Sequence, residues 1–185
     1  MSISPYYLIF DKTIIGFRLI ALMFLMLGLS THALANCNDA RNPRTTPNQM
    51  FIIHDDGTVT HNATTLMWMR CLLGQVWDGN ACSGSAQIYI WQDALQAANG
   101  YSFAGYNDWR LPNKNELISI VERACIGPAI NSTVFPYTSN LSTVWSSSQP
   151  PDLSSYAFIV EFDSGHTKIP FKTSYSHVRL VRGGL

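Results

Sequence analysis

Short runs of apolar residues separated by turn residues recur from residue 51 onward and predict a sheet-rich domain. Residues 51–53 and 58–60 flank an Asp-Gly pair, which is the turn chemistry of a hairpin. Residues 66–69 are apolar on both faces of an extended chain, as expected for a strand buried inside a sheet. Further strands are predicted at residues 87–90, 144–148, 156–162, 167–171 and 176–181.

Two other segments carry apolar residues at helical spacing. Residues 91–99 form the first, and Gly100 is placed to end it. The second follows Asn113, which can act as an N-cap, and Glu116 lies three residues later, as in a capping box. Its apolar positions extend to Ala124 and predict a helix of about 11 residues. Because the helices precede a predicted β-meander, the expected fold class is α+β.

The Trp-Arg-Leu-Pro segment at residues 109–112 leads into the second helix and is the predicted structural centre of the domain. Its proline keeps the preceding residue extended, so the tryptophan and the leucine point to the same face, which we expect to be core. Arg110 is expected to form a buried or half-buried pair with a carboxylate, either Asp108 or Glu161. We assign structural roles to Asp108, Trp109, Arg110, Glu116 and Trp145.

Residues 1–35 have the features of a secretory signal peptide. Lys12 and Arg18 precede an apolar run at residues 19–29, and Ala-Leu-Ala at residues 33–35 fits a cleavage site. The run is too short to span a membrane, which needs about 20 apolar residues. We expect cleavage after residue 35, with an uncleaved anchor or a lipoprotein as the alternatives.

Cleavage would leave a secreted, periplasmic or cell-surface chain without a membrane span. Residues 36–50 are polar and contain two prolines, so they are predicted to form an extended N-terminal arm before a domain at residues 51–185. Removing residues 1–35 leaves 10 basic and 11 acidic residues. This near-neutral balance gives no support for nucleic-acid binding.

All four cysteines lie after residue 35, and an even number behind an export signal predicts two disulfides. Three pairings are possible. We favour Cys71 with Cys82, because these residues enclose a short, turn-rich loop, which leaves Cys37 to pair with Cys125. A zinc site is the alternative, but the cysteines lack C-x-x-C spacing and have no histidine at ligand spacing.

The sequence contains no recognisable catalytic constellation. The histidines lie near predicted turns or strands, and none accompanies a nucleophile motif such as G-x-S-x-G. Three serines at residues 146–148 have no assignable base. Calcium ligation by Asp55 and Asp56, or by Asn107 and Asp108, is an alternative to turn chemistry at these positions. We therefore expect neither an enzyme nor a bound cofactor.

Basic residues are unevenly distributed, since no acidic residue follows Asp163. A local basic surface can bind a sulfated or phosphorylated polymer even when the total charge is neutral. Instead of binding a ligand, Arg179 and Arg182 could pair with carboxylates and serve a structural role. Lys168 and Lys172 could simply be solvated surface residues. The candidate ligand-binding residues are His166, Lys168, Lys172, Arg179 and Arg182.

Several motifs occur in a fixed order between residues 50 and 184. They are Asp-Gly-Thr-Val-Thr from residue 56, Trp-Gln-Asp-Ala-Leu from residue 91, Tyr-Asn-Asp-Trp-Arg-Leu-Pro-Asn from residue 106, Trp-Ser-Ser-Ser from residue 145 and Val-Arg-Leu-Val-Arg-Gly-Gly from residue 178. This set resembles the C-terminal domain of the Legionella collagen-like (Lcl) family. More distantly, it is similar to the C-type-lectin-like and formylglycine-generating-enzyme group, which implies a compact domain with two helices and twisted antiparallel sheets.

The Lcl resemblance implies an adhesin-like module that recognises sulfated glycosaminoglycans at a bacterial surface. The chain contains no collagen-like repeat and no cysteine after Cys125, so neither trimerisation nor the oxidase chemistry of the formylglycine enzymes is carried over. We therefore expect non-catalytic binding of a sulfated or other anionic glycan. The alternative is a structural or accessory subunit that binds protein in a surface assembly.

Overall fold

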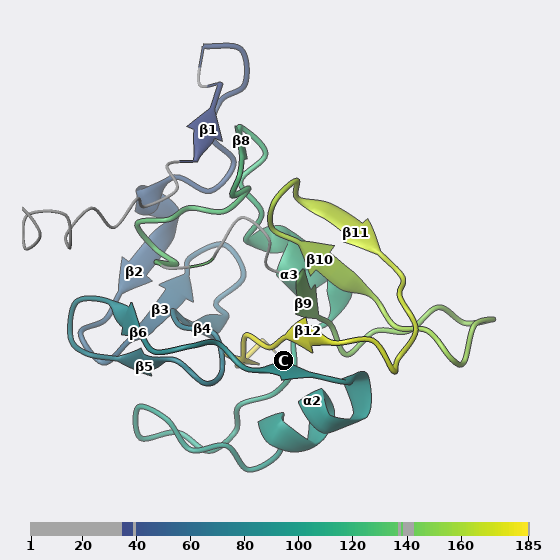
Figure 1. The fold of residues 1–185 in the computed structure, drawn as a ribbon. Coiled ribbons are helices and arrows are strands. Elements are labelled where there is room, and N and C mark those ends of the chain that lie inside the picture. Colours follow the sequence, from purple (N-terminus) through teal and green to yellow (C-terminus); the bar gives the residue numbers. More distant parts are fainter. Residues whose placement is uncertain (1–34, 39, 137, 139–142, 185) are drawn as a thin grey trace, which may run out of the picture. The chain divides into compact units, whose positions relative to one another are not determined.

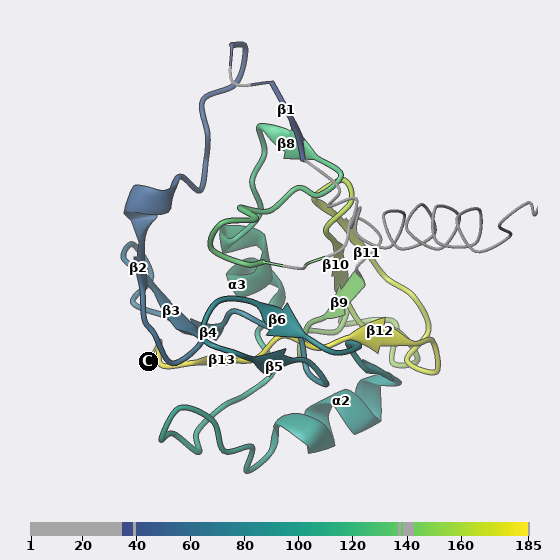
Figure 2. The ribbon, with the colours of Figure 1, turned by 60° about the vertical axis from the view of Figure 1, so that its left-hand side comes forward.

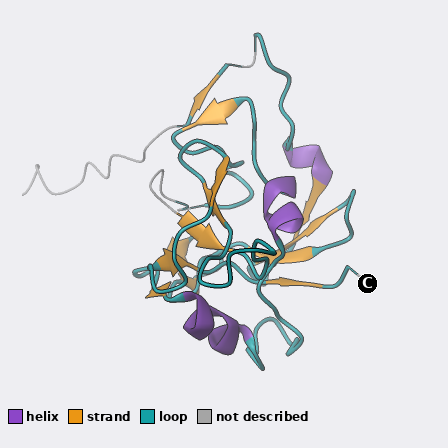
Figure 3. Cartoon of the chain, turned by 90° about the vertical axis from the view of Figure 1, so that its right-hand side faces the viewer, coloured by secondary structure: helices purple, strands orange, loops and turns teal. Residues whose placement is uncertain are grey.

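The computed structural model describes residues 35–38, 40–136, 138 and 143–184. The predicted signal peptide lies outside these residues, apart from residue 35. Within the described ranges, no helix is both long enough and apolar enough to cross a membrane. The elements are short and are joined by extensive turns and loops (Figure 3).

The described residues combine two α-helices with several sheets, which confirms the predicted α+β class (Figure 1). The helices are α2 (Trp91–Ala98), α3 (Lys114–Ser119) and the 3-10 helix η1 (Asn48–Met50). The strands are β1 (Asn36–Cys37), β2 (Phe51–Ile53), β3 (Thr58–His61), β4 (Met67–Met69), β5 (Val76–Trp77), β6 (Cys82–Ser83), β7 (Ile88–Tyr89), β8 (Cys125–Ile126), β9 (Thr143–Trp145), β10 (Ile159–Glu161), β11 (His166–Lys168), β12 (Ser176–His177) and β13 (Val181–Arg182). The more specific resemblance to C-type lectins stays a prediction.

One sheet has four strands in the order β13-β4-β3-β2. The predicted hairpin forms between β2 and β3, with Ile53 opposite Val59. Asp56 accepts hydrogen bonds from the N–H of Thr58 at 2.9 Å and from its hydroxyl at 2.7 Å, so it acts as a turn residue. Strand β4 lies between β3 and β13, and its Trp68 is fully buried, as predicted for a strand inside a sheet.

A second sheet has five strands in the order β11-β10-β9-β12-β7, and β9, β10 and β11 form the expected antiparallel meander. The single strand predicted at residues 176–181 is wrong, because the chain crosses between sheets within it. Strand β12 belongs to the five-stranded sheet and β13 to the four-stranded sheet. Strand alternation predicts Val178 and Leu180 inward and Arg179 and Val181 on the opposite face. All four are buried, because the crossing segment is covered on both sides.

Helix α3 lies between the four-stranded sheet and strands β9 to β11 (Figures 1 and 2). Its Leu117 and the following Ile120 are fully buried. They belong to one hydrophobic cluster with Val59 and Trp68 of the first sheet and Val160 of the second. Burial of each such side chain contributes about 1.5–3 kcal/mol, so α3 joins the two sheets through a shared core.

Helix α3 begins with the predicted capping box but ends at Ser119, so the longer predicted helix is wrong. Contacts with residues distant in the sequence end helix α3 at this point. Val121 forms an antiparallel bridge with Ile130, and the N–H of Glu122 donates to the carbonyl of Ala129 at 3.0 Å. These bonds replace the helical ones that a longer helix would need.

Helix α2 confirms the first predicted helix and packs on a second hydrophobic cluster. Ala94 and Ala98 are buried on its inner face. They join Trp109, Leu111 and Trp145 in this cluster, so the Trp-Arg-Leu-Pro segment contributes to the core as expected.

Both predicted disulfides are present, Cys37–Cys125 and Cys71–Cys82. The first lies where β1 pairs with β8, so it closes the N-terminal arm onto the domain. The second closes the turn-rich loop that contains the small β5-β6 sheet.

Glu122 is fully buried and hydrogen-bonds to the N-terminal arm. Its Oε1 and Oε2 accept hydrogen bonds from the N–H groups of Thr45 and Thr46, each at 2.9 Å, and Oε1 accepts another from Ala124 at 3.0 Å. Desolvation opposes ionisation of Glu122, but these hydrogen bonds outweigh it and lower the pKa below its ordinary value. The Asn131 amide also donates to the Thr46 carbonyl at 2.8 Å.

Gly165 lies in the turn between β10 and β11 with a φ of +75°, a conformation that favours glycine. A Cβ at this position would lie 2.7 Å from Cγ1 of Val121. We expect Gly165→Ala to lower the free energy of unfolding by about 2–3 kcal/mol, because backbone strain and overpacking add. Chemical denaturation under non-reducing conditions measures this change.

Gly100→Ala is the matched control for this prediction. Gly100 has a similar φ of +71°, but a Cβ there would meet nothing within 4 Å. This variant should lose only the strain contribution, about 1–2 kcal/mol. Equal losses in the two variants would contradict the packing argument at Gly165.

Candidate functional site

The Trp-Arg-Leu-Pro segment is a structural junction with its two apolar side chains in the core. Trp109 and Leu111 are each 3% exposed. The indole N–H of Trp109 donates to the Phe103 carbonyl at 3.1 Å. Trp145 is likewise buried, and its indole N–H donates to the Tyr89 carbonyl at 2.7 Å. The indole nitrogens of Trp109 and Trp145 are thus each satisfied by a carbonyl, as is usual for buried polar groups.

Glu116 serves both the helix cap and an ion pair with Arg110. The two terminal guanidinium nitrogens of Arg110 lie 2.8 and 2.7 Å from the Glu116 carboxylate oxygens. Desolvation opposes ionisation of Glu116, but hydrogen bonds from Arg110 and from the Asn113 N–H outweigh it and lower the pKa. The predicted pairing of Arg110 with Asp108 or Glu161 is wrong, because the capping carboxylate is the partner instead.

Asp108 pairs with Arg182, as the structural alternative for Arg182 predicts. The Nε of Arg182 lies 2.7 Å from Oδ1 of Asp108, and its Nη2 lies 3.1 Å from Oδ2. The guanidinium also lies 3.7 Å from the ring centre of Tyr106. Hydrogen bonding by Arg182 lowers the pKa of Asp108. These contacts hold Arg182 at the junction.

Arg179 is fully buried, so its side chain is not available to a ligand and the prediction that it binds one is wrong. Its guanidinium donates to the carbonyls of Met69 and Arg70 and to the Thr138 hydroxyl, the last at 2.6 Å. It also lies 4.9 Å from the ring centre of Phe135. Burial lowers the pKa of Arg179 to about 9, and the group remains a cation at neutral pH. Arg179 therefore links the crossing segment to the end of β4.

The remaining candidates lie on one exposed segment, residues 166–175, which we call the 166–175 surface. His166 and Lys168 belong to β11 and are exposed. The Nζ of Lys168 lies 2.7 Å from Oε1 of Glu161, while its side chain stays 57% exposed. Hydrogen bonds from Lys168 and then from Ser164 lower the Glu161 pKa.

Aromatic side chains border the cations of the 166–175 surface. Tyr156 stacks on Phe171 with ring centres 4.4 Å apart. Phe171 and Tyr175 are 54% and 65% exposed, which is unusual for large aromatic residues. The Nζ of Lys172 lies 4.2 Å from the ring centre of Trp91, so a cation–π contact positions this ammonium group.

The Tyr156–Phe171 pair is not among the sequence-based predictions, because the alternation of residues 156–162 only places Tyr156 on the same face as Phe162. A turn of residues 163–165 alone would place Tyr156 opposite Lys172. In the structure Glu161 lies opposite His166, and this register places Tyr156 opposite Phe171, where the two residues form an antiparallel bridge. The pair lies outside the two strands, since Tyr156 precedes β10 and Phe171 follows β11.

Two of the four candidate calcium ligands, Asp56 and Asp108, have other partners. Asp56 serves the hairpin turn and Asp108 the ion pair with Arg182. In the part of the chain that the structure describes, no three His, Cys, Asp or Glu side chains are grouped to hold a metal ion.

Comparison with known proteins places the chain in a family. A search of curated proteins found no match. A family model described as the Lcl C-terminal domain matches residues 57–182, which cover most of the described domain from the first hairpin to β13. The chain therefore belongs to the Lcl C-terminal domain family.

Proposed function

We propose that this protein is a non-catalytic binding module for sulfated or other anionic glycans, secreted or held at a cell surface. The observation that carries the proposal is the 166–175 surface, where two lysines adjoin exposed aromatic rings. Ammonium groups attract sulfate and carboxylate groups. Amphipathic or apolar rings can pack against the apolar face of a sugar.

The two lysines differ in how they would engage such a ligand. The Lys168 side chain is 57% exposed and that of Glu161 is 23% exposed. Ion pairs at the surface contribute only about 0–1 kcal/mol, so a sulfate can replace the carboxylate at low cost. Lys172 is held by Trp91 and by the Gln149 side-chain oxygen at 2.6 Å. A cation fixed in this way loses little conformational freedom when a ligand arrives.

We expect the purified protein to bind a heparin column at low salt and to elute as salt rises, because salt screens exposed charges. The variant Lys168→Ala/Lys172→Ala should elute at clearly lower salt, since it lacks both ammonium groups of the 166–175 surface. Column retention and a sulfated-glycan array measure the change.

The matched control is Arg41→Ala/Arg123→Ala, which removes two exposed cations from outside the 166–175 surface. Its elution should stay close to that of the unmodified protein. Flow-through of the unmodified protein at low salt, together with no signal on any sulfated glycan, would reject the proposal. An equal shift in both double variants would reject the assignment to this surface.

A further inference from the structure

The sequence contains one Asn-Gly pair, Asn99–Gly100, at the C-terminal end of α2. Asparagine is among the thermolabile residues. Its side-chain amide is lost when the backbone nitrogen of the next residue attacks the side-chain carbonyl carbon, Cγ. A glycine in the next position favours this attack, because it has no Cβ beside its nitrogen. The pair is therefore a candidate for covalent modification without an enzyme.

Both reacting groups of this pair lack hydrogen bonds to other described residues. The Asn99 side chain has no such partner, and the Gly100 N–H donates to none. Both residues are exposed, and a Cβ built on Gly100 would meet nothing within 4 Å. The attack requires rotation of the Asn99 backbone from its ψ of 117°. Asn99 is the C-cap of α2, and helix ends open at little cost in free energy.

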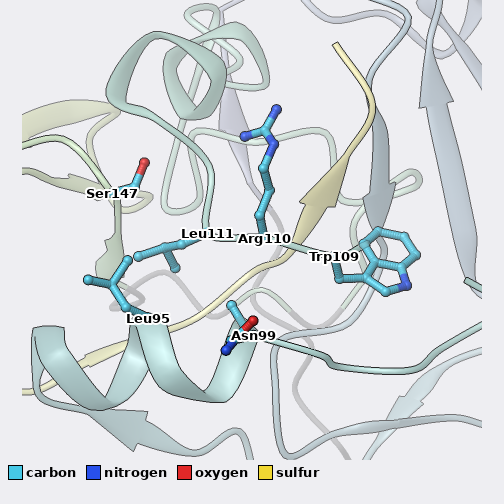
Figure 4. A pocket seen from close by; sticks show the side chains of 7 residues that line it. Leu95, Asn99, Trp109, Arg110, Leu111 and Ser147 are labelled. Atoms are coloured by element: carbon cyan, nitrogen blue, oxygen red, sulfur yellow. The ribbon is translucent and has the colours of Figure 1, made fainter. Parts of the chain in front are cut away.

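The Asn99 side chain also borders a cavity of about 330 Å³. Figure 4 shows this side chain at the end of α2, on the side of the helix that faces the segment carrying Arg110 and Leu111. A cavity needs only about 10–15 Å³ to hold a water molecule. The space beside Asn99 can therefore admit the water that the reaction consumes and release the ammonia that it produces.

Two other asparagines precede a small residue, alanine, and each has one of its reacting groups engaged. The Asn62 side-chain amide donates to the Gln49 carbonyl at 3.1 Å. After Asn80, the Ala81 N–H donates to Oδ1 of Asp78 at 2.8 Å. Asn62 and Asn80 are therefore internal controls within the same chain.

We propose that Asn99 deamidates spontaneously through a cyclic imide formed with Gly100. The Gly100 nitrogen loses its proton and bonds to Cγ of Asn99, and the side-chain nitrogen leaves as ammonia. Water then adds to one of the two imide carbonyls. Opening at Cγ yields aspartate. Opening at the main-chain carbonyl yields isoaspartate, in which the chain continues through the former side-chain carbonyl.

Either product places a new carboxylate at the C-terminal end of α2. This end of a helix carries a partial negative charge, so the carboxylate is repelled there. Isoaspartate also lengthens the main chain by a methylene between Ala98 and Tyr101, where the Tyr101 N–H donates to the Ala98 carbonyl at 3.2 Å and closes a turn. The modified protein should therefore unfold at a lower urea concentration.

The test is incubation of the purified protein in mildly alkaline water labelled with heavy oxygen, followed by peptide mapping with mass spectrometry. Heavy oxygen should enter the new carboxylate at residue 99, and an isoaspartate-specific methyltransferase should label the same peptide. Asn99→Gln should lose both signals, because glutamine would have to close a larger ring. Gly100→Ala should slow the reaction at least about tenfold, since its Cβ crowds the attacking nitrogen.

A synthetic peptide of residues 95–104 is the positive control, and the incubation continues well beyond its complete conversion. The proposal is overturned if residue 99 of the protein is still unlabelled at that time. It is also overturned if Asn62 and Asn80 acquire label as fast as Asn99, or if Gly100→Ala reacts at the same rate as the unmodified protein. None of these outcomes depends on glycan binding at the 166–175 surface.

Discussion

Trp109→Ala should lower the free energy of unfolding by about 3–5 kcal/mol, the range for truncating a buried aromatic side chain. Trp109 is 3% exposed and belongs to the cluster under α2, so its removal leaves a cavity there. It also leaves the Phe103 carbonyl without its indole donor. Such a loss is a large part of the total stability of a single domain. Urea denaturation with the disulfides intact, followed by far-UV circular dichroism, measures it.

Trp109→Phe is the matched control, because it keeps an aromatic ring in the cluster and removes the hydrogen bond and part of the volume. Trp109→Phe should lower the free energy of unfolding by about 1–2 kcal/mol, clearly less than Trp109→Ala. If Trp109→Ala unfolded at nearly the same urea concentration as the unmodified protein, the role of this residue in the core would be refuted.

Glu122→Gln should lower the free energy of unfolding by about 3–4 kcal/mol at pH 7, since several buried donors lose a charged acceptor. A glutamine keeps one oxygen but places an NH₂ group where the other carboxylate oxygen accepts from Thr46. The N-terminal arm then loses its internal attachment at Thr45 and Thr46.

Glu122 also predicts how stability depends on pH. Its folded-state pKa is lowered from the ordinary value of 4.5, so its stabilising effect is complete above that value. The effect is lost as pH falls through the folded-state pKa, because the folded protein must then accept a proton on a group that favours the charged form. A series of denaturation curves between pH 7 and pH 3 should show this loss, and Glu122→Gln should lack it.

Glu161→Gln is the control for Glu122→Gln, because it removes a carboxylate at the surface and not a buried one. Glu161 also has a lowered pKa, yet it pairs with the exposed Lys168 at the surface. Its replacement should cost less than about 1 kcal/mol. Identical pH profiles for the unmodified protein and Glu122→Gln would show that the buried carboxylate does not govern acid stability.

Local sequence signals predicted the local features of the structure well. The Asp-Gly hairpin, the capping box at Asn113 and Glu116, and the helix at residues 91–99 each depend on residues only a few positions apart. Both disulfides followed from loop composition and from the even cysteine count. Such features are set mainly by turn chemistry and side-chain spacing, which a single sequence displays.

Predictions that depended on distant contacts were less successful. Helix α3 ends early because Val121 pairs with Ile130 and the Glu122 carboxylate binds residues 45 and 46. Arg179 is buried because its segment crosses from one sheet to the other, so the outward face expected from strand alternation does not exist. Neither the sheet order nor the crossing can be read from residue spacing.

The Cys37–Cys125 disulfide determines how the domain would carry mechanical load. A pulling force applied at residue 35 reaches Cys125 through a covalent bond, so it bypasses residues 38–124. Strands β2 to β4 and helices α2 and α3 lie in that bypassed loop and are loaded only through their contacts with the rest of the chain. Reduction of the disulfide would transfer the same force to the hydrogen bonds of the N-terminal arm and then to the hairpin.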